Sequence, residues 1–588
     1  MILNLTPEQI KGKIDYIKKY ADASNSADGS LVDSNANVDT KNIGILEAEL
    51  YKPETIQINR EIVKQKLESM FPGMGAQYIK DIESHIIYIH DETSLRPYCA
   101  SITLFPFLLN GTKPLGGTSK APKNLHSFCG SFVNLVYQVA SGFAGAVATV
   151  EFLLYFDYFA KKTYGADYLT TNKKDIEQSL QGVVYALNQP ASARGNQSVF
   201  WNISVLDRHY FEHLFGTFHF PDGSQVQYDG SFRSLQYLFM EWFRKEREKE
   251  LLTYPVLTAS MLIDDDEGTP VDTEFAEMCA EEMAKGLSFF IYESKSVDSL
   301  ASCCRLRNEL SDNTFSYTLG AGGVSTGSVQ VITLSMNRLV QQKKDTVSDV
   351  VSRVHKYLLA HRAVIADYMN SGLLPAYTAG FINIDKQFLT VGINGMLEAS
   401  EFLHGKPDIE FYKDTLKTIY LLNKEDGKKY KVKYNTEFVP AENLGVKNAK
   451  WDKEDGLVVP RDCYNSYFFP VESSEYSIID KLDMHGTRTT AFLDGGAACH
   501  LNLAQLLTKK QAYKLMCLAG KKGVSYWTFN CLMTICDDCG YINVNTENHC
   551  TKCGSTNVGY ATRVIGYLKR IDSFSTARQK EAMKRYYI

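Results

Sequence analysis

The sequence predicts an α/β fold, consistent with an α/β barrel. Apolar runs with the length and period of strands alternate with helical stretches across most of residues 90–530. The chain has 588 residues, and α/β barrels reach large sizes as single units, so its length is compatible with one catalytic domain. A content of 44% hydrophobic and 22% charged residues is typical of a soluble globular protein.

The N-terminal region is predicted to begin with a helix. Thr6 has the form of an N-cap, Pro7 suits the first helical position, and Gln9 stands where a capping box needs it. These signals predict a helix to about Tyr20. The polar residues 22–37 that follow are a loop by composition.

The next part of the chain supplies the first strands and helices. Residues 82–91 predict the end of a helix followed by a loop. Residues 128–164 are apolar and long enough for two buried helices. Residues 194–198 form a loop that leads into a strand near residues 200–203. A further strand is predicted over residues 329–334.

The second half of the chain continues this alternation. Residues 406–456 are rich in charges of both signs and predict a solvated, partly helical periphery. Two more core strands are predicted within residues 464–470 and 492–500. Residues 526–530 lead into the C-terminal region.

Composition excludes several kinds of partner. The net charge of -5 shows no bulk basic character, so nucleic acid is not predicted as a direct partner. No apolar run reaches the roughly 18 residues that cross a bilayer, and the N-terminus lacks the pattern of a secretory leader. We therefore expect no membrane association and a cytoplasmic location. The 13 cysteines show no disulfide-like framework, which fits reduced thiols.

Four cysteines near the C-terminus predict a metal site. Cys536 and Cys539 form one Cys-x-x-Cys-Gly turn, and Cys550 and Cys553 form a second one across a short polar connection. Each turn can direct two thiolates at one ion, and four soft ligands favour tetrahedral zinc. With no open position, the predicted zinc is structural rather than catalytic.

The apolar run at residues 562–568 contains a glycine, Gly566, between Ile565 and Tyr567. Glycine in such a run loses side-chain packing and backbone entropy, so something should compensate. One interpretation is a bulge or a close backbone approach. The other is that the α-carbon itself is the reagent, because a residue without a β-carbon lets an α-carbon radical lie flat between its two amides.

The Arg-x-x-Gly-Tyr run at residues 563–567, directly after the four-cysteine turns, resembles the signature of anaerobic (class III) ribonucleoside-triphosphate reductases, which are glycyl-radical enzymes. The resemblance implies a ten-stranded α/β barrel of the glycyl-radical enzyme type, made of two antiparallel halves of five parallel strands, with a small C-terminal zinc ribbon. We expect a catalytic barrel with N-terminal helices over residues 1–530, the zinc knuckle over 531–556, and the radical loop and tail over 557–588.

The implied activity is the anaerobic reduction of ribonucleoside triphosphates to 2′-deoxyribonucleoside triphosphates, which supplies DNA precursors. In this interpretation Gly566 stores the radical. Cys304, in the Ser-Cys-Cys-Arg run that resembles the family's finger loop, becomes the thiyl that removes the ribose 3′-hydrogen, with Cys303 as the alternative. Cys99 resembles the active-site cysteine on the first barrel strand, which donates a hydrogen atom; a lone cysteine is otherwise a small buried hydrophobe.

Two glycine-rich turns with hydroxyl side chains are candidates for holding substrate phosphates, because backbone amides of such turns can bind phosphate oxygens. The alternative for each turn is a plain loop, since neither has the residue order of a P-loop or a dinucleotide fingerprint. The candidate residues are Gly117, Thr118 and Ser119 in the first turn and Gly322, Gly323 and Ser325 in the second.

The resemblance also implies partners. A separate activating enzyme, which uses S-adenosylmethionine and an iron–sulfur cluster of its own, must reach Gly566 and install the radical. Family members are homodimers with deoxynucleotide effectors that set specificity. The additional N-terminal nucleotide-binding module of many members is not seen here, so we expect no ATP/dATP on-off switch of that form.

The electron source is predicted from departures from the family pattern. Formate-using members have an Asn two residues before a pattern of Leu or Met, any residue, and Arg. When this pattern is aligned on Arg338, the chain has Ser335 in place of that Asn, and Asn337 lies two positions away from it. They also carry a Met where this chain has Asn557. A small dithiol protein is therefore favoured over formate as the external reductant.

Two other functions are compatible with parts of the pattern. A glycyl-radical acyltransferase or lyase of the pyruvate formate-lyase type also has adjacent cysteines, although the four-cysteine turns and the separate Cys99 argue against it. In a non-enzymatic binding protein, the four cysteines would be a docking zinc ribbon and Gly566 a bulge.

Overall fold

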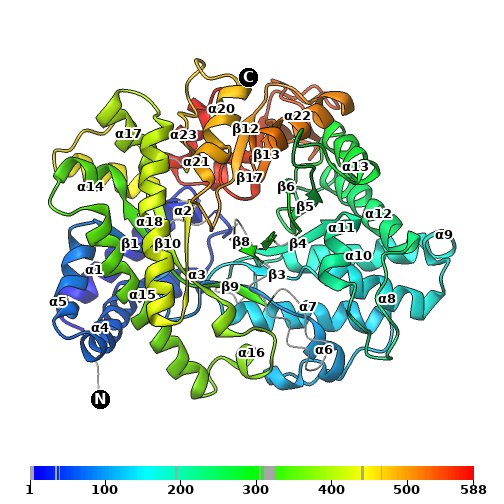
Figure 1. The fold of residues 1–588 in the computed structure, drawn as a ribbon, viewed down its shortest axis with the longest axis horizontal. Helices are drawn as coiled ribbons and strands as arrows, with labels where there is room; N and C mark the ends of the chain where they lie inside the picture. Colours follow the sequence, from blue (N-terminus) through cyan, green and yellow to red (C-terminus); the bar gives the residue numbers. More distant parts are fainter. Residues whose placement is uncertain are drawn as a thin grey trace.

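A computed structural model describes residues 5–33, 36–38, 40–191, 196–297, 299–302, 306–309, 325–438, 443–464 and 466–588. Its centre is a ring of ten strands, with helices around the outside (Figure 1). The expected ten-stranded α/β barrel is confirmed, because the order and direction of the strands are those of two parallel halves.

The first half of the barrel contains five parallel strands in chain order. They are β2 (Cys99–Ser101), β3 (Val147–Ala148), β4 (Trp201–Leu206), β5 (Val256–Leu262) and β6 (Phe290–Ser294). The second half contains β9 (Thr326–Ser335), β10 (Phe388–Asn394), β11 (Lys433–Phe438), β12 (Cys499–Asn502) and β13 (Tyr526–Asn530). The halves meet antiparallel at β2 with β9 and at β6 with β13.

The barrel closes between β11 and the turn before β12. Phe438 N donates to the carbonyl of Gly496 at 3.2 Å, and Gly495 N donates to the carbonyl of Thr436 at 2.8 Å. A β-carbon on Gly495 would lie 2.4 Å from that Thr436 oxygen, so this contact between the two chain segments requires glycine.

Helices connect successive strands and cover the outside of the ring. The longer ones in the first half are α7 (Leu125–Ser141), α8 (Phe152–Tyr164), α10 (Lys173–Asn188), α11 (Arg208–Phe215), α12 (Gly230–Arg247) and α13 (Thr273–Ala284). Those in the second half are α14 (Met336–Gln342), α15 (Val347–Asn370), α17 (Met396–His404), α18 (Ile409–Tyr430), α19 (Leu444–Glu454), α20 (Ile478–His485) and α22 (Lys509–Lys522). The two buried helices predicted within residues 128–164 are confirmed as α7 and α8, with β3 between them.

The N-terminal region contains the predicted first helix, but the predicted loop over residues 22–37 is wrong in part, because α2 (Ser26–Gly29) lies within it. This region contains α1 (Pro7–Asp22), α2, α3 (Ile43–Leu50), α4 (Lys52–Met70) and α5 (Met74–Glu83). Thr6 and Gln9 form the predicted capping box at the start of α1. The predicted loop after residue 82 is wrong in part, because β1 (Ile87–Ile89) pairs antiparallel with β9. Three residues are too few for a periodic signal.

Two further predictions about the second half are wrong in part, although α18 and α19 confirm the helical content predicted for residues 406–456. The supposed periphery at residues 406–456 contains β11, a barrel strand whose Asn435, Thr436 and Glu437 are all buried. Thr436 accepts from Asn423 of the outer helix α18, so buried polar residues lie on both faces of this strand and hide the alternation that marks a half-buried strand. Residues 466–469 are bends rather than a strand, and β12 begins only at Cys499, because the turn at residues 493–496 closes the barrel.

The C-terminal part forms a separate four-stranded antiparallel sheet in the order β15 (Ile542–Asn543), β14 (Met533–Cys536), β16 (Val558–Arg563) and β17 (Leu568–Arg570). The last helix, α23 (Thr576–Lys584), follows it. Because β16 pairs with both β14 and β17, one sheet joins the four-cysteine turns to the segment that carries Gly566.

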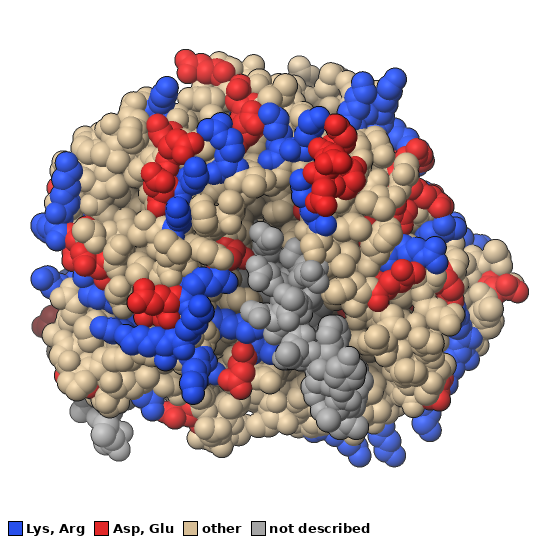
Figure 2. Space-filling view, viewed as in Figure 1, with Lys and Arg blue, Asp and Glu red and all other residues tan. Residues whose placement is uncertain are grey.

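Charges of both signs are intermixed over most of the face shown in Figure 2, in keeping with the small net charge of -5. Within the described part of the chain, every helix is too short or too polar to traverse a lipid bilayer.

Candidate active site

Cys99 lies on the inner wall of the barrel. In the neighbouring row, Ala100, Val147 and Trp201 are in register, and the Trp201 ring packs against rings of the outer helices α7 and α8, so this row faces outward. Side chains alternate along a strand, so Cys99 faces inward. The thiol is buried and clusters with Ala146 and Phe200.

A second inward row contains Ser101, Ala148 and Asn202, which are in register on β2, β3 and β4. Asn202 is 6% exposed, and neither polar atom of its amide has a partner among the described residues. The Ser101 hydroxyl also has none there. Because an unpaired buried polar group is costly, this row is suited to a polar ligand beside Cys99. Sequence reasoning missed it, although alternation from Cys99 to Ser101 was a usable signal.

Gly566 lies in the turn between β16 and β17, and this turn is buried. Its backbone is outside the left-handed region, and a β-carbon built on it would have no described atom within 4 Å beyond its chain neighbours. Neither backbone conformation nor close approach therefore requires glycine here. Among the described residues nothing supports the bulge or close-approach interpretation, and the radical role of Gly566 stays a prediction.

Arg563, three residues before Gly566, ties the turn to the barrel through hydrogen bonds. Its guanidinium donates to the Gly566 carbonyl at 3.2 Å, to Ser288 Oγ at 2.8 Å and to the Ser288 carbonyl at 3.0 Å. It also lies over the inward-facing Phe290 ring, 4.8 Å from the ring centroid. Burial lowers the pKa of Arg563 to about 10, because no carboxylate among the described residues pairs with it.

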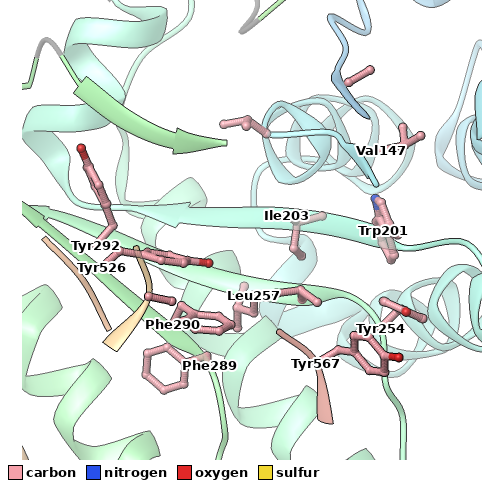
Figure 3. Close-up of a cluster of buried hydrophobic side chains, with 14 of the residues drawn as sticks. Val147, Trp201, Ile203, Tyr254, Leu257, Phe289, Phe290, Tyr292, Tyr526 and Tyr567 are labelled. Carbon is pink, nitrogen blue, oxygen red and sulfur yellow. The ribbon is translucent and has the colours of Figure 1, made fainter. Parts of the chain in front are cut away.

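Tyr567, the residue after Gly566, packs against aromatic rings of the barrel. Its ring lies 5.4 Å from that of Phe200 and 6.3 Å from that of Tyr254, as the close-up in Figure 3 shows for Tyr254. Phe200 is also a neighbour of Cys99. Phe200 thus lies beside both Tyr567 and Cys99, so the structure brings the Gly566 turn near Cys99, although Gly566 and Cys99 are 467 positions apart in the chain.

The C-terminal helix braces the same turn. Arg585 donates from Nη1 to the Arg563 carbonyl at 3.2 Å and from Nη2 to the Val564 carbonyl at 2.6 Å. Glu581 holds the Arg585 guanidinium at 2.9 Å, and this buried ion pair keeps the pKa of Glu581 below its usual value despite desolvation. Sequence reasoning assigned no role to this helix, and no spacing in the sequence points to it.

The predicted finger loop is described only at its base. β7 (Ser299–Ser302) and β8 (Leu306–Glu309) pair as an antiparallel hairpin that projects onto the middle of the strand ring in Figure 1. Cys303 and Cys304 lie outside the described residues, so their roles stay predictions. Gly322 and Gly323 of the second phosphate turn also lie outside, while Ser325 is buried just before β9.

The first phosphate turn is held together by its own backbone. Gly117 N donates to the Thr112 carbonyl at 3.0 Å, and Ser119 N donates to Thr112 Oγ1 at 3.2 Å. Two of the amides that could bind phosphate are therefore already used, while Thr118 is exposed. A phosphate site at Gly117, Thr118 and Ser119 stays a prediction.

The four C-terminal cysteines form one cluster. Their sulfur atoms all lie within 4.8 Å of one another, with Cys536 and Cys553 at 3.6 Å and Cys539 and Cys550 at 3.7 Å. Zinc–sulfur bonds of about 2.3 Å at tetrahedral angles place sulfur atoms about 3.8 Å apart. The cluster fits a tetrahedral zinc ion, as the spacing predicts.

Comparison with known proteins agrees with this geometry. A sequence model described as "Anaerobic ribonucleoside-triphosphate reductase" matches residues 47–587. A solved anaerobic ribonucleotide reductase superposes with a TM-score of 0.85 at 25% identity, covering 99% of this chain and 93% of the other. The Thermotoga maritima enzyme, solved with dATP and CTP, gives 0.83 at 26% identity, with coverage of 99% and 100%. No protein with a curated description matches in sequence.

The fold and these matches define an anaerobic ribonucleotide reductase built on a ten-stranded α/β barrel. The chain belongs to the anaerobic ribonucleoside-triphosphate reductase family. It is therefore an oxidoreductase that converts ribonucleoside triphosphates to the deoxyribonucleoside triphosphates needed for DNA. The pyruvate formate-lyase type and the non-enzymatic zinc ribbon, which the sequence left open, are excluded as accounts of the whole chain.

Proposed function

We propose that reduction proceeds through a radical stored on Gly566, a thiyl on Cys304 and a hydrogen atom donated by Cys99. The burial of Gly566, together with the absence of any described contact that requires glycine, carries the proposal. The decisive test is the electron paramagnetic resonance doublet expected after anaerobic activation, which should be lost in Gly566→Ala. An identical signal in that variant would reject Gly566 as the radical site.

The proposed step is balanced as follows. The thiyl sulfur takes the 3′-hydrogen atom from the ribose, the C2′–O bond breaks, and the hydroxyl leaves as water after gaining a proton. Cys99 supplies the hydrogen atom that replaces it and is left as a sulfur radical. The external reductant provides two electrons and two protons: one proton leaves in the water, one electron goes to the sugar, and the other electron and proton restore the Cys99 thiol. The 3′-hydrogen atom then returns from the Cys304 thiol, which regenerates the thiyl. Oxygen would attack the stored radical, so the reaction is anaerobic.

The thiyl assignment requires a test that separates two neighbours. Cys304→Ser should abolish turnover while the Gly566 radical still forms, whereas Cys303→Ser should retain turnover. The reverse pattern would move the thiyl to Cys303.

We propose that the row of Ser101 and Asn202 binds the ribose hydroxyls. Both side chains point into the barrel beside Cys99, and the small Ala148 between them leaves room for a ligand. Their unsatisfied polar atoms would be paired only when a ligand or water is present. The Gly117 and Ser325 turns stay candidates for the phosphates.

A dithiol protein is proposed as the reductant. Asn337 donates to Asp452 and to the Tyr464 hydroxyl, both at 2.8 Å. Its amide nitrogen is therefore already hydrogen-bonded within the protein and is not available to bind formate. Asn557 is exposed and donates to Asp538, in the knuckle. Neither residue therefore takes the place of the Asn or the Met that formate-using members carry. Turnover driven by a reduced thioredoxin-like donor, but not by formate, is expected; formate-driven turnover would reverse the assignment.

We propose further that a separate activating enzyme with S-adenosylmethionine and an iron–sulfur cluster installs the radical, and that the zinc knuckle fixes the start of the radical loop. The knuckle residues fit zinc, whose role here is structural. The Thermotoga maritima enzyme was solved with dATP in its specificity site, which supports deoxynucleotide effectors for this chain too. A homodimer and a cytoplasmic location complete the proposal.

A further inference from the structure

The segment between α1 and α3 reaches across to the C-terminal part of the chain. We call residues 25–33 and 36–38 the N-terminal strap. It lies before the region that the family model matches, residues 47–587. Three of its side chains contact residues around the Gly566 turn.

Asn25 makes the first contact. Its side-chain amide donates to the carbonyls of Asp572 and Phe574, both at 3.0 Å. The Phe574 ring is fully buried and stacks on the Tyr567 ring, with centroids 6.2 Å apart. Asn25 therefore holds the backbone of a residue that packs directly on the neighbour of Gly566.

Asp28 makes the second contact. Its carboxylate accepts from Thr576 N at 2.9 Å and from Thr576 Oγ1 at 2.8 Å. Thr576 is the first residue of α23, and its own N-cap, Ser575, makes no side-chain capping bond. A negative charge at a helix N-terminus is favourable, so Asp28 caps α23 from a distant part of the chain. The other end of that helix presents Arg585 to the Arg563 and Val564 carbonyls.

Asn37 makes the third contact, inside the protein. It is 4% exposed, accepts from the Tyr254 hydroxyl at 2.7 Å, and donates to the Ser198 carbonyl at 3.3 Å. Tyr254 is fully buried beside Phe200 and Tyr567. Asn37 therefore holds the hydroxyl of Tyr254, a second ring that lies beside Tyr567.

We infer that Asn25, Asp28 and Asn37 are positioning residues for the Gly566 turn. Together they fix Phe574 and Tyr254, two rings that lie beside Tyr567, as well as the helix whose C-terminal end binds the carbonyl of Arg563. A peptide that exchanges a hydrogen atom with a sulfur must be held at a defined separation, and small displacements are costly. The inference rests on the proposed radical role of Gly566, and it adds that the strap holds the turn in its reactive position.

The test measures turnover per unpaired electron in the full-length enzyme after anaerobic activation. Two variants remove strap contacts. The first is the double variant Asn25→Ala/Asp28→Ala. The second is Tyr254→Phe, which deletes only the hydroxyl group that donates to Asn37. Lys18→Ala, on the exposed face of α1, is the matched control. We expect deoxynucleotide formation per spin to fall about tenfold or more in the strap variants and to be unchanged in the control.

Rescue separates positioning from simple stability. Asn can cap a helix as well as Asp, so Asp28→Asn should recover most of the turnover per spin that Asp28→Ala loses. Turnover per spin that stays within about twofold of wild type in both strap variants overturns the inference, even if their melting temperatures fall. If the wild-type enzyme itself shows no doublet, the radical role of Gly566 fails instead.

Discussion

Arg563 and Gly566 are joined by a buried hydrogen bond of 3.2 Å from the guanidinium to the glycine carbonyl. The same guanidinium lies over Phe290 of the barrel wall. The turn is thus fixed to the wall through its own flanking residue, while a β-carbon on the glycine would meet no described atom within 4 Å beyond its chain neighbours.

That free space makes Gly566→Ala a clean test. Since the added methyl group meets no described atom within 4 Å, the free energy of unfolding should change by no more than about 1 kcal/mol. The radical doublet and turnover should both disappear.

Gly327→Ala is the contrasting control. Its φ of +154° and a β-carbon only 2.1 Å from the Cys99 carbonyl make this substitution strained. Thermal unfolding should show a large loss of stability for Gly327→Ala and almost none for Gly566→Ala. A comparable loss in both would mean that Gly566 is structural.

Cys99→Ala should uncouple radical storage from reduction. Cys99 is a small buried side chain, so the barrel should remain folded and the Gly566 doublet should still form. Deoxynucleotide formation should fall by about 10³-fold or more, because the hydrogen donor is lost. Cys517→Ser on α22 is the matched control and should keep full activity; substantial turnover in Cys99→Ala would exclude the donor role.

Asn202→Leu should affect function and stability in opposite directions. Replacing an unpaired buried amide by an apolar side chain of similar size is neutral or stabilising, so the melting temperature should hold or rise. Loss of hydrogen bonds to the ribose should raise KM about three- to tenfold. A normal KM would show that the row of Ser101 and Asn202 does not bind substrate.

Removal of zinc should block radical installation while the barrel stays folded. The knuckle strand β14 pairs with β16, which leads directly into the Gly566 turn, so loss of the metal disorders the start of that turn. Cys539→Ser should have the same effect, and Cys531→Ser, just outside the cluster, should not. The readouts are circular dichroism and the doublet, and an unaffected radical yield in metal-free enzyme would contradict the proposed role.

Glu151 should contribute a pH dependence to stability. Burial raises the pKa of this carboxyl from 4.5 to about 7, although it accepts from Leu104 N at 2.6 Å. Between these values the folded state keeps a proton that the unfolded state releases. The stability gained by this proton is complete below pH 4.5 and is lost as pH rises through about 7, a change of roughly 3 kcal/mol.

Glu151→Gln should remove this part of the slope, because the amide does not titrate. Chemical denaturation from pH 5 to 7.5 should then show a flatter curve than wild type. Glu8→Gln on the exposed face of α1 is the control and should keep the wild-type slope. An equal slope in Glu151→Gln would mean that other groups carry the dependence.

The sequence by itself determined those features whose parts are close together in the chain. The two Cys-x-x-Cys-Gly turns predict the thiolate cluster because each turn brings its own two ligands together. The same is true of the capping box of Thr6 and Gln9, which forms within one helical turn. The Arg-x-x-Gly-Tyr run is also local, so the sequence alone singled out Gly566. The family resemblance of this run was the basis for predicting a ten-stranded barrel.

Only the tertiary structure decided which distant segments meet. β11 was hidden in a charged stretch because buried polar residues lie on both of its faces, and Asn202 beside Ser101 depends on strand register rather than spacing. The junction of Cys99, Phe200 and Tyr567, and the strap that reaches it, join residues from both ends of the chain. Such contacts are set by the packing of the whole barrel, which no local pattern encodes.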